Sequence, residues 1–262
     1  MKNPAYSDFV VLVTGASTGL GRAIAVETAA QGAKVVVINY ARSVEEAQET
    51  ARLVEAHGAQ AVLVQGDVGQ DADCRTIAAA AQAFGRIDAL FNNAGVTMFA
   101  RYNNLDAVQA EDFLRIYNVN VVGAFQMVRA CRSLLESAPQ PGAVVNTTSI
   151  SAVTGMGSSI PYAASKGALS TMTVSLAQAL APRIRVNAVC PGFIDTPWFE
   201  KTLSPHVAAR NREVAADVTL LKVASSAEDI ADAAVFLGGR NARHVTGESL
   251  VVDAGLRYGA KS

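Results

Sequence analysis

Short apolar runs alternate along the chain with longer Ala-rich amphipathic stretches. The short runs are nearly continuous in Val, Ile and Leu, which is typical of strands that are covered on both faces of a sheet. They occupy Phe9–Thr14, Lys34–Asn39, Gln60–Gln65, Ala89–Asn92, Ala143–Thr147, Arg185–Val189 and Ser249–Val252. The longer stretches, which we expect to be helices, cover Gly21–Gln31, Ser43–His57, Asp71–Phe84, Ala107–Ser137, Tyr162–Leu180 and Ser226–Gly238.

This alternation predicts an α/β fold. Parallel strands need crossover connections, and helices in right-handed crossovers cover both faces of the sheet. We therefore expect a parallel sheet of about seven strands in a single doubly wound domain. The alternation runs almost from end to end without a Pro/Ser/Gly-rich linker, so we assign residues 1–262 to that one domain.

One segment, at about 196–223, breaks the rhythm. It contains Pro197, Pro205, Trp198, Phe199 and many charges, but no strand where one is due. Helices inserted over the carboxyl ends of the strands would fit, because sheets of this kind bind their ligands there. A surface helical hairpin without a catalytic role fits equally well. We take the first interpretation and expect a helical substrate loop.

Composition narrows the classes of function. The 262 residues carry 22 Lys+Arg and 23 Asp+Glu, so the chain lacks the basic excess that general binding to nucleic acid or an anionic membrane requires. Three scattered cysteines and three scattered histidines predict reduced thiols and no metal site. We find no signal-peptide pattern and no apolar stretch of roughly 20 residues, and we expect a cytoplasmic protein. Only 17% of the residues are charged, which favours burial against a sister subunit.

A glycine-rich turn follows the first apolar run. It reads Thr14-Gly15-x-x-x-Gly19-x-Gly21 and opens a helical pattern. Glycines allow a tight turn and let a pyrophosphate approach the amino terminus of the helix, whose free N–H groups bind anions. An ordinary strand-to-helix turn seldom needs three glycines in seven residues. The P-loop is excluded because no Lys-Ser/Thr follows, but the adenosylmethionine site of a methyltransferase remains an alternative.

The ends of the second and third strands bear on the choice of nucleotide. The second continues as Asn39-Tyr40-Ala41-Arg42-Ser43, without the Asp or Glu that an NAD site usually places there. Arg42 and Ser43 could instead receive a 2′-phosphate, so we expect NADP, with NAD as the alternative and a solvated Arg42 as the simpler interpretation. Asp67-Val68 ends the third strand, where the carboxylate could bind an adenine amino group or cap the next helix.

Three side chains suggest acid–base chemistry. Tyr162 and Lys166 are four positions apart and therefore share one face of a helix. A phenol has an unperturbed pKa near 10 and is a poor base unless a cation such as the Lys166 ammonium favours phenolate. Ser149 lies just past the fifth strand, at the same edge of the sheet as the glycine turn. Its hydroxyl could orient a substrate carbonyl beside the phenol.

These motifs together resemble a known family. The set comprises the glycine turn, Asn92-Asn93-Ala94-Gly95, Asn120 in Val-Asn-Val-Val-Gly, Ser149, Tyr162-Ala-Ala-Ser-Lys166 and Pro191-Gly192. In order and spacing it is similar to the classical short-chain dehydrogenase/reductase family from about Phe9 to Gly255, and most of all to 3-oxoacyl-carrier-protein reductases. The resemblance implies a Rossmann-like fold and hydride transfer between NADP(H) or NAD(H) and a ketone or secondary alcohol, with a 3-oxoacyl thioester as one candidate.

The resemblance also implies roles for single residues. Tyr162 would exchange a proton with the substrate oxygen, Lys166 would hold the nicotinamide ribose and lower the pKa of Tyr162, and Ser149 would bind the substrate oxygen. Asn120 would hold a water that links Lys166 to solvent, unless it kinks its helix or binds backbone. The residues implied at the cofactor are Gly15, Ser17, Thr18, Gly19, Leu20, Gly21, Tyr40, Arg42, Ser43, Asp67, Val68, Asn93, Ala94, Gly95, Tyr162, Lys166, Pro191, Gly192, Ile194 and Thr196. Family members form homotetramers, for which Ala107–Ser137 and Tyr162–Leu180 would supply the interfaces.

Some positions leave alternatives open. Thr18 stands where many NADP-dependent members have a basic residue, so the expectation of NADP rests on Arg42. A protein that senses dinucleotides or acts as a scaffold without catalysis is the second hypothesis, although such proteins tend to lose the Tyr or Lys. Met98, Phe99, Met156, Trp198 and Phe199 suggest an apolar substrate or, equally, core or subunit contacts. Arg101, Arg129 and Arg132 could attract an acidic carrier protein or simply lie at the surface.

Overall fold

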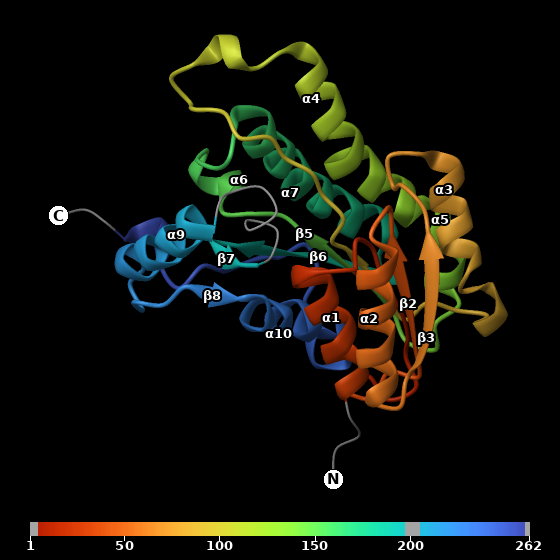
Figure 1. The fold of residues 1–262 in the computed structure, drawn as a ribbon. Coiled ribbons are helices and arrows are strands. Elements are labelled where there is room, and N and C mark those ends of the chain that lie inside the picture. Colours follow the sequence, from red (N-terminus) through yellow and green to blue (C-terminus); the bar gives the residue numbers. More distant parts are fainter. Residues whose placement is uncertain (1–4, 197–204, 260–262) are drawn as a thin grey trace.

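The computed structural model describes residues 5–196 and 205–259. Within them a parallel sheet of seven strands forms, in the order β3-β2-β1-β4-β5-β6-β9 (Figure 1). The strands are β1 (Val10–Val13), β2 (Val35–Tyr40), β3 (Gln60–Gln65), β4 (Ala89–Asn92), β5 (Gly142–Thr147), β6 (Ile184–Pro191) and β9 (Ser249–Val252). All seven lie where the apolar runs predict them, which confirms the expected fold class.

The strand order determines where a ligand can bind. From β1 the chain adds β2 and β3 on one side, and it then returns to add β4, β5, β6 and β9 on the other side. The loops that leave β1 and β4 therefore diverge to opposite faces of the sheet. The carboxyl ends of these two neighbouring strands border a crevice, which is the usual binding position in an open parallel sheet.

Each face of the sheet has its own core, because successive side chains of a strand point to opposite faces. In β1, Val11 and Val13 belong to one apolar cluster, whereas Val10 and Leu12 belong to the other. Helices α1 (Gly19–Ala30), α2 (Val44–Ala56) and α10 (Ala227–Gly238) cover the first face (Figure 1). Helices α3 (Asp71–Ala79), α5 (Ala124–Glu136) and α7 (Ile160–Leu180) cover the second.

The long helix predicted at Ala107–Ser137 is divided. A 3₁₀ turn at Leu105–Ala107 precedes α4 (Ala110–Tyr117), and the π-helical segment Asn118–Gly123 connects α4 to α5. A wider helical turn of this kind commonly marks a functional region. Periodicity alone could not reveal it, since the apolar spacing continues through the segment. The predicted helix Asp71–Phe84 likewise ends early, with α3 followed by a 3₁₀ turn at Gln82–Phe84.

The segment at about 196–223 contains helix α9 (Pro205–Val218). It is flanked by a pair of two-residue strands that the sequence pattern did not predict, β7 (Ile194–Asp195) and β8 (Ser225–Ser226). Residues 197–204, including Trp198 and Phe199, lie outside the described residues. The remaining short elements are α6 (Ser151–Thr154) and 3₁₀ turns at Arg240–Ala242 and Leu256–Tyr258. Among the described helices, none is both long and apolar enough to cross a bilayer.

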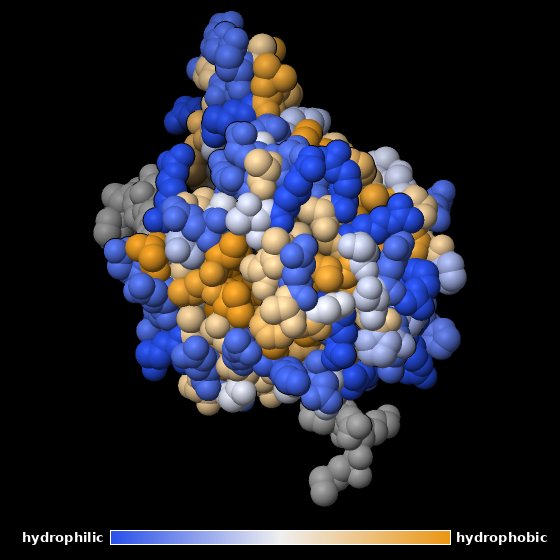
Figure 2. Space-filling model, turned by 90° about the vertical axis from the view of Figure 1, so that its right-hand side faces the viewer, coloured by the Kyte–Doolittle hydropathy of each residue, from blue (hydrophilic) through white to orange (hydrophobic). Residues whose placement is uncertain are grey.

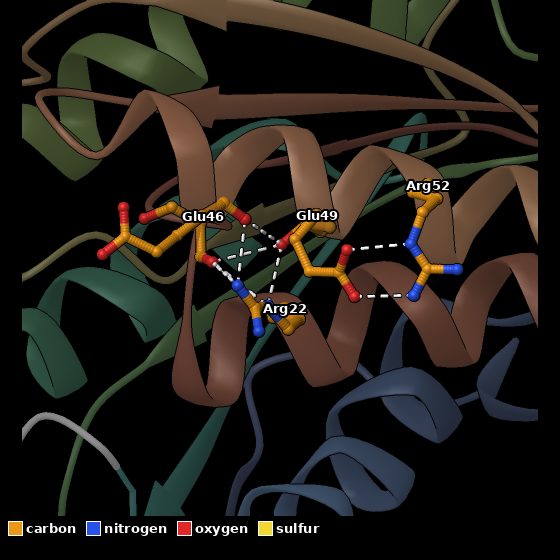
Figure 3. A network of polar contacts seen from close by, with 6 residues as sticks. Arg22, Glu46, Glu49 and Arg52 are labelled. Atoms are coloured by element: carbon orange, nitrogen blue, oxygen red, sulfur yellow. Dashed lines mark hydrogen bonds and ion pairs between the residues drawn. The ribbon is translucent and has the colours of Figure 1, made fainter.

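A half-buried arginine connects the glycine turn to α2 (Figure 3). The Arg22 Nη2 donates to the main-chain oxygens of Ser17 at 2.7 Å and Glu46 at 2.9 Å. Its Nε donates to the same Ser17 oxygen and to the Thr50 hydroxyl, at 3.1 and 2.9 Å. Thr50 is fully buried, and its hydroxyl lies within hydrogen-bond distance of the same Ser17 and Glu46 oxygens, at 3.1 and 3.0 Å. Arg22 thereby holds the turn, α1 and α2 in one arrangement.

We expect the Arg22→Met variant to lower the free energy of unfolding by about 2 kcal/mol, because it leaves two main-chain oxygens without their charged donor. Arg52→Met is the matched control. Arg52 pairs only with Glu49 in Figure 3, with side chains that are 66% and 43% exposed, and such pairs contribute less than about 1 kcal/mol. Urea unfolding of both variants measures the difference. Equal losses would contradict the assigned role of Arg22.

Candidate active site

A cavity of about 940 Å³ opens at the carboxyl edge of the sheet. The ends of β1 to β6 and the start of α7 contribute to its wall. All the residues implied by the resemblance line it except Gly21, Tyr40 and Asn120. Eight further residues line the cavity that the sequence did not predict there: Asn39, Ala41, Gly66, Val96, Arg115, Val119, Thr147 and Thr148.

The glycine turn is packed too tightly for side chains. Gly15 has φ +60°, and a Cβ there would lie 2.9 Å from the Cα of Ala94. At Gly21 a Cβ would lie 2.3 Å from the Gly15 oxygen and 2.5 Å from the Asn93 Nδ2. Gly21 therefore does not line the cavity, but its lack of a side chain lets α1 approach the turn closely. Thr18, the N-cap of α1, makes no side-chain cap, so the first N–H groups of α1 are available to an anion.

Thr14 and Asn93 join this turn to the loop after β4. The Thr14 hydroxyl accepts hydrogen bonds from the main-chain N–H groups of Asn93 and Ala94, both at 3.0 Å. In return the Asn93 Nδ2 donates to the oxygens of Thr14 and Gly15, both at 3.1 Å. These four bonds fix the two loops that border the crevice.

Asn39 fixes the adjacent strand end. Its side chain is buried, accepts from the Gly15 N–H at 3.2 Å and donates to the Gly66 oxygen at 3.0 Å. Strand alternation directs the neighbouring Tyr40 to the opposite face, which explains why Tyr40 does not line the cavity. Arg42, which is exposed, and Ser43, which is partly exposed, lie at the rim.

Asp67, Val68, Arg115 and Val119 all line the cavity, and a Cβ added at Gly69 would lie 3.2 Å from the Asp67 Oδ1 and 3.5 Å from the Val119 Cγ2. The Asp67 carboxylate accepts from the Gly69 N–H at 2.9 Å, so it stabilises the turn after β3, while Gln70 is the N-cap of α3. Arg115 and Val119 are four positions apart on α4 and the π segment, and this spacing puts them on one side. Their contribution from a distant helix gave no signal in the sequence.

The three side chains that suggest acid–base chemistry, Ser149, Tyr162 and Lys166, meet in the wall of the cavity. Lys166 is buried, and its Nζ donates to the Thr147 oxygen at 2.8 Å and lies 5.6 Å from the centre of the Tyr162 ring. The Ser149 hydroxyl lies beside the phenol and donates to the hydroxyl of Ser151 at 3.0 Å. Tyr162 is fixed in the first turn of α7, where its N–H donates to the Ser159 Oγ at 3.4 Å.

Burial is the largest influence on the pKa values of Tyr162 and Lys166. It raises the pKa of Tyr162 to about 12, and the hydrogen bond with Ser149 opposes the rise. It lowers the pKa of Lys166 to about 8. Desolvation of the buried phenolate is the largest cause at Tyr162, so the pKa of its phenol lies above the ordinary value although Lys166 is nearby. At neutral pH the site holds a protonated phenol beside an ammonium group.

Asn120 lies behind the cavity wall in the π segment. Its Oδ1 accepts from the Val96 N–H at 2.8 Å, and its Nδ2 donates to the Val96 oxygen and the Ser165 hydroxyl, both at 3.0 Å. A Cβ added at Gly95 would lie 3.4 Å from the Asn120 Oδ1 and 3.6 Å from the Lys166 Nζ. Asn120 thus binds backbone, and both Asn120 and Lys166 lie beside Gly95.

Of the remaining candidates, those within the described residues do not line the cavity. Phe99 and Met156 are 47% and 63% exposed, and Met98 is partly buried. Arg129 is paired with Asp71 and Arg132 with Glu136, while Arg101 is exposed. Among the described residues, no cluster of His, Cys, Asp and Glu side chains could hold a metal ion.

Comparisons with known proteins agree with this geometry. The family model described as "Enoyl-(Acyl carrier protein) reductase" matches residues 15–257. A protein named as ketoacyl reductase 2 of the granaticin polyketide synthase from Streptomyces violaceoruber is 40% identical, over 94% of this chain and 95% of its own length. An L-rhamnose 1-dehydrogenase (NAD(P)(+)) from Azotobacter vinelandii is 37% identical, over 95% and 96%.

A solved structure extends the likeness to three dimensions. The protein comes from Burkholderia xenovorans, is classed as a short-chain dehydrogenase/reductase and superposes with a TM-score of 0.87 at 37% identity, over 97% of this chain and 99% of its own. The shared sheet, the motifs in register and the matched length lead to one conclusion. The chain belongs to the classical short-chain dehydrogenase/reductase family, whose members transfer hydride between a nicotinamide cofactor and an alcohol or ketone.

Proposed function

We propose that the chain binds NADP(H) in the 940 Å³ cavity and reduces a ketone or oxidises a secondary alcohol there. The observation that carries this proposal is the meeting of Ser149, Tyr162 and Lys166 in the wall of the cavity, where β5 ends and α7 begins. The proposal treats the chain as one dinucleotide-binding and catalytic domain. The segment at about 196–223 is its substrate loop, because Ile194, just before it, and Thr196, its first residue, line the cavity.

The residues present fit a dinucleotide. The turn excludes side chains at Gly15 and Gly21, which leaves main-chain N–H groups to face a pyrophosphate. A nicotinamide, when bound, supplies or accepts the hydride. Asn93, Ala94 and Gly95 would contact the ribose of the adenosine half, and Pro191, Gly192, Ile194 and Thr196 the nicotinamide half.

The chain's own groups handle the proton. In the reducing direction the Tyr162 phenol, protonated at neutral pH, donates its proton to the carbonyl oxygen while the Ser149 hydroxyl donates a hydrogen bond to it. Lys166 holds the nicotinamide ribose from its position on the Thr147 oxygen. Asn120 would hold a water between Lys166 and solvent, since its Oδ1 keeps a second lone pair beside the bond from Val96.

The Tyr162→Phe variant tests this chemistry. We expect kcat to fall on the order of a thousandfold, because the variant lacks the proton donor, while the dissociation constant for NADPH stays unchanged. Oxidation of NADPH, followed by absorbance with acetoacetyl-coenzyme A, butane-2,3-dione and 2-butanone, measures the rates of wild type and variant. The thioester is our first candidate, which the name of the Streptomyces relative supports. Retained turnover would refute the role of Tyr162, and would favour a different acid.

The preference for NADP rests on the end of β2. Residues 39–43 at the end of β2 include no Asp or Glu. Asn39 is bound to Gly15 and Gly66, and Arg42 lies at the rim. We expect Arg42→Ala to weaken NADPH binding roughly 10- to 100-fold, by the loss of a charge-assisted bond, and to leave NADH binding unchanged. Fluorescence titration measures both constants. Arg101→Ala, at an exposed residue outside the cavity, is the control, and equal losses for the two cofactors would reject the assignment.

We propose a homotetramer that buries α4, α5 and α7. Phe113, Leu114, Val122 and Phe125 on α4, the π segment and α5 are 36 to 70% exposed, and Val174 on α7 is 42% exposed. Figure 2 shows the side where α3, α5 and β3 lie in Figure 1, with apolar side chains in patches between charged ones. Single apolar residues at a surface are ordinary, but contiguous ones favour an interface.

Sedimentation velocity checks the assembly. We expect four times the chain mass of 27.3 kDa for the wild type and smaller species for Phe125→Arg, which would bury a charge at the interface. Leu63→Arg is the matched control on the edge strand β3 and should sediment as the wild type does. A monomeric wild type would exclude the tetramer. We also propose that the enzyme works in the cytoplasm, which its three free, buried cysteines support and cell fractionation would check.

A further inference from the structure

Ser151 holds the hydroxyl of Ser149 from two sides. The main-chain N–H of Ser151 donates to the Ser149 Oγ at 3.1 Å, and the Ser149 hydroxyl donates to the Ser151 Oγ at 3.0 Å. Both residues are buried, with 8% of Ser149 and 4% of Ser151 exposed. In the described structure the side chain of Ser151 has Ser149 as its hydrogen-bond partner, so its hydroxyl serves no helix cap.

The Ser151 side of this pair is closely packed. A Cβ on Gly157 would lie 2.5 Å from the Ser151 Oγ and 3.3 Å from the Cδ1 of Tyr162. The backbone on either side of Ser149 is bound to β6, since the Thr148 N–H donates to the Val189 oxygen and the Ile150 N–H to the Pro191 oxygen, both at 2.9 Å. The two hydroxyls therefore keep their separation while their protons remain free to turn.

A serine hydroxyl has one proton and two lone pairs. When Ser149 donates to a substrate carbonyl, it releases the Ser151 oxygen, and the Ser151 hydroxyl can turn and donate to Ser149. The Ser149 oxygen then accepts from both the N–H and the O–H of Ser151, which occupies both lone pairs. Its own proton has one direction left, toward the cavity, and linked hydrogen bonds of this kind strengthen one another.

We propose that Ser151 is a positioning residue that makes Ser149 a hydrogen-bond donor to the substrate carbonyl. The inference rests on the proposed function for its catalytic consequence. It adds to the site a residue that does not line the cavity and that acts through Ser149.

The Ser151→Ala variant tests this role, because it removes the hydroxyl and keeps the N–H. We expect kcat for ketone reduction to fall roughly three- to tenfold, the effect of one hydrogen bond, with the KM of the ketone changed less and the dissociation constant for NADPH unchanged. Ser151→Thr, which restores a hydroxyl, should recover the rate. The control is Thr154→Ala on the same short helix, because the Thr154 hydroxyl donates to the Ile150 oxygen at 3.0 Å and not to Ser149.

A double-mutant cycle separates positioning from general support. In the Ser149→Ala background, Ser151→Ala should cause no further loss, since it acts through the missing hydroxyl. A full additional loss there, or an unchanged rate in Ser151→Ala alone, would overturn the proposal. These rates use whichever carbonyl of the panel the wild type reduces fastest.

A crystal structure of Ser151→Ala gives a readout that needs no substrate. We expect the Ser149 side chain to leave its present rotamer or to occupy two. A single, unmoved Ser149 rotamer would count against the proposal. A wild type that binds NADPH but reduces none of the carbonyls would instead overturn the proposed function, and the rotamer of Ser149 would still decide the positioning role.

Discussion

The close approach of main-chain segments at the carboxyl edge of β1 and β4 is the constraint on which the rest of the site depends. Gly21 lies so near the Gly15 oxygen and the Asn93 amide that a single added carbon would separate α1 from the sheet. Thr14 and Asn93 then link the two loops through main-chain groups. Packed interiors tolerate little added volume, so the packing of the main chain alone fixes the shape of the cavity where the nucleotide would bind.

Around Tyr162 and Lys166, buried side chains rather than close main-chain packing determine the properties of the site. There the backbone is supported from behind, by the bond of Lys166 to Thr147 and by the bonds of Asn120 to Val96, while the reacting side chains are buried together. Burial raises the pKa of the phenol and lowers that of the lysine, so both groups favour their neutral forms relative to water. In the protein alone the phenol of Tyr162 therefore stays protonated at neutral pH.

Sequence patterns predicted the strands and most of the cavity because both depend on local rules. Continuous apolar runs require cover on both faces, and a strand, glycine turn and helix in succession have one common use. Strand alternation could also have excluded Tyr40. The π segment, Arg115 and Ser151 could not be predicted, since each depends on contacts between residues far apart in the chain or on the direction of one hydroxyl. The rise in the pKa of Tyr162 could not be predicted either, because the sequence shows the neighbouring cation but not the depth of burial.

The arginine that joins the glycine turn to α2 has a consequence for how the site can change over time. Arg22 binds the main-chain oxygens of Ser17 and Glu46, and such oxygens are present whichever side chain stands at those two positions. Substitutions around the adenosine pocket can therefore accumulate, and cofactor preference can drift between lineages or be redesigned, while the frame that supports the pyrophosphate persists. Because the Arg22 guanidinium group holds the main chain of the glycine turn and of α2, the residues that contact the adenosine half can change without moving the turn.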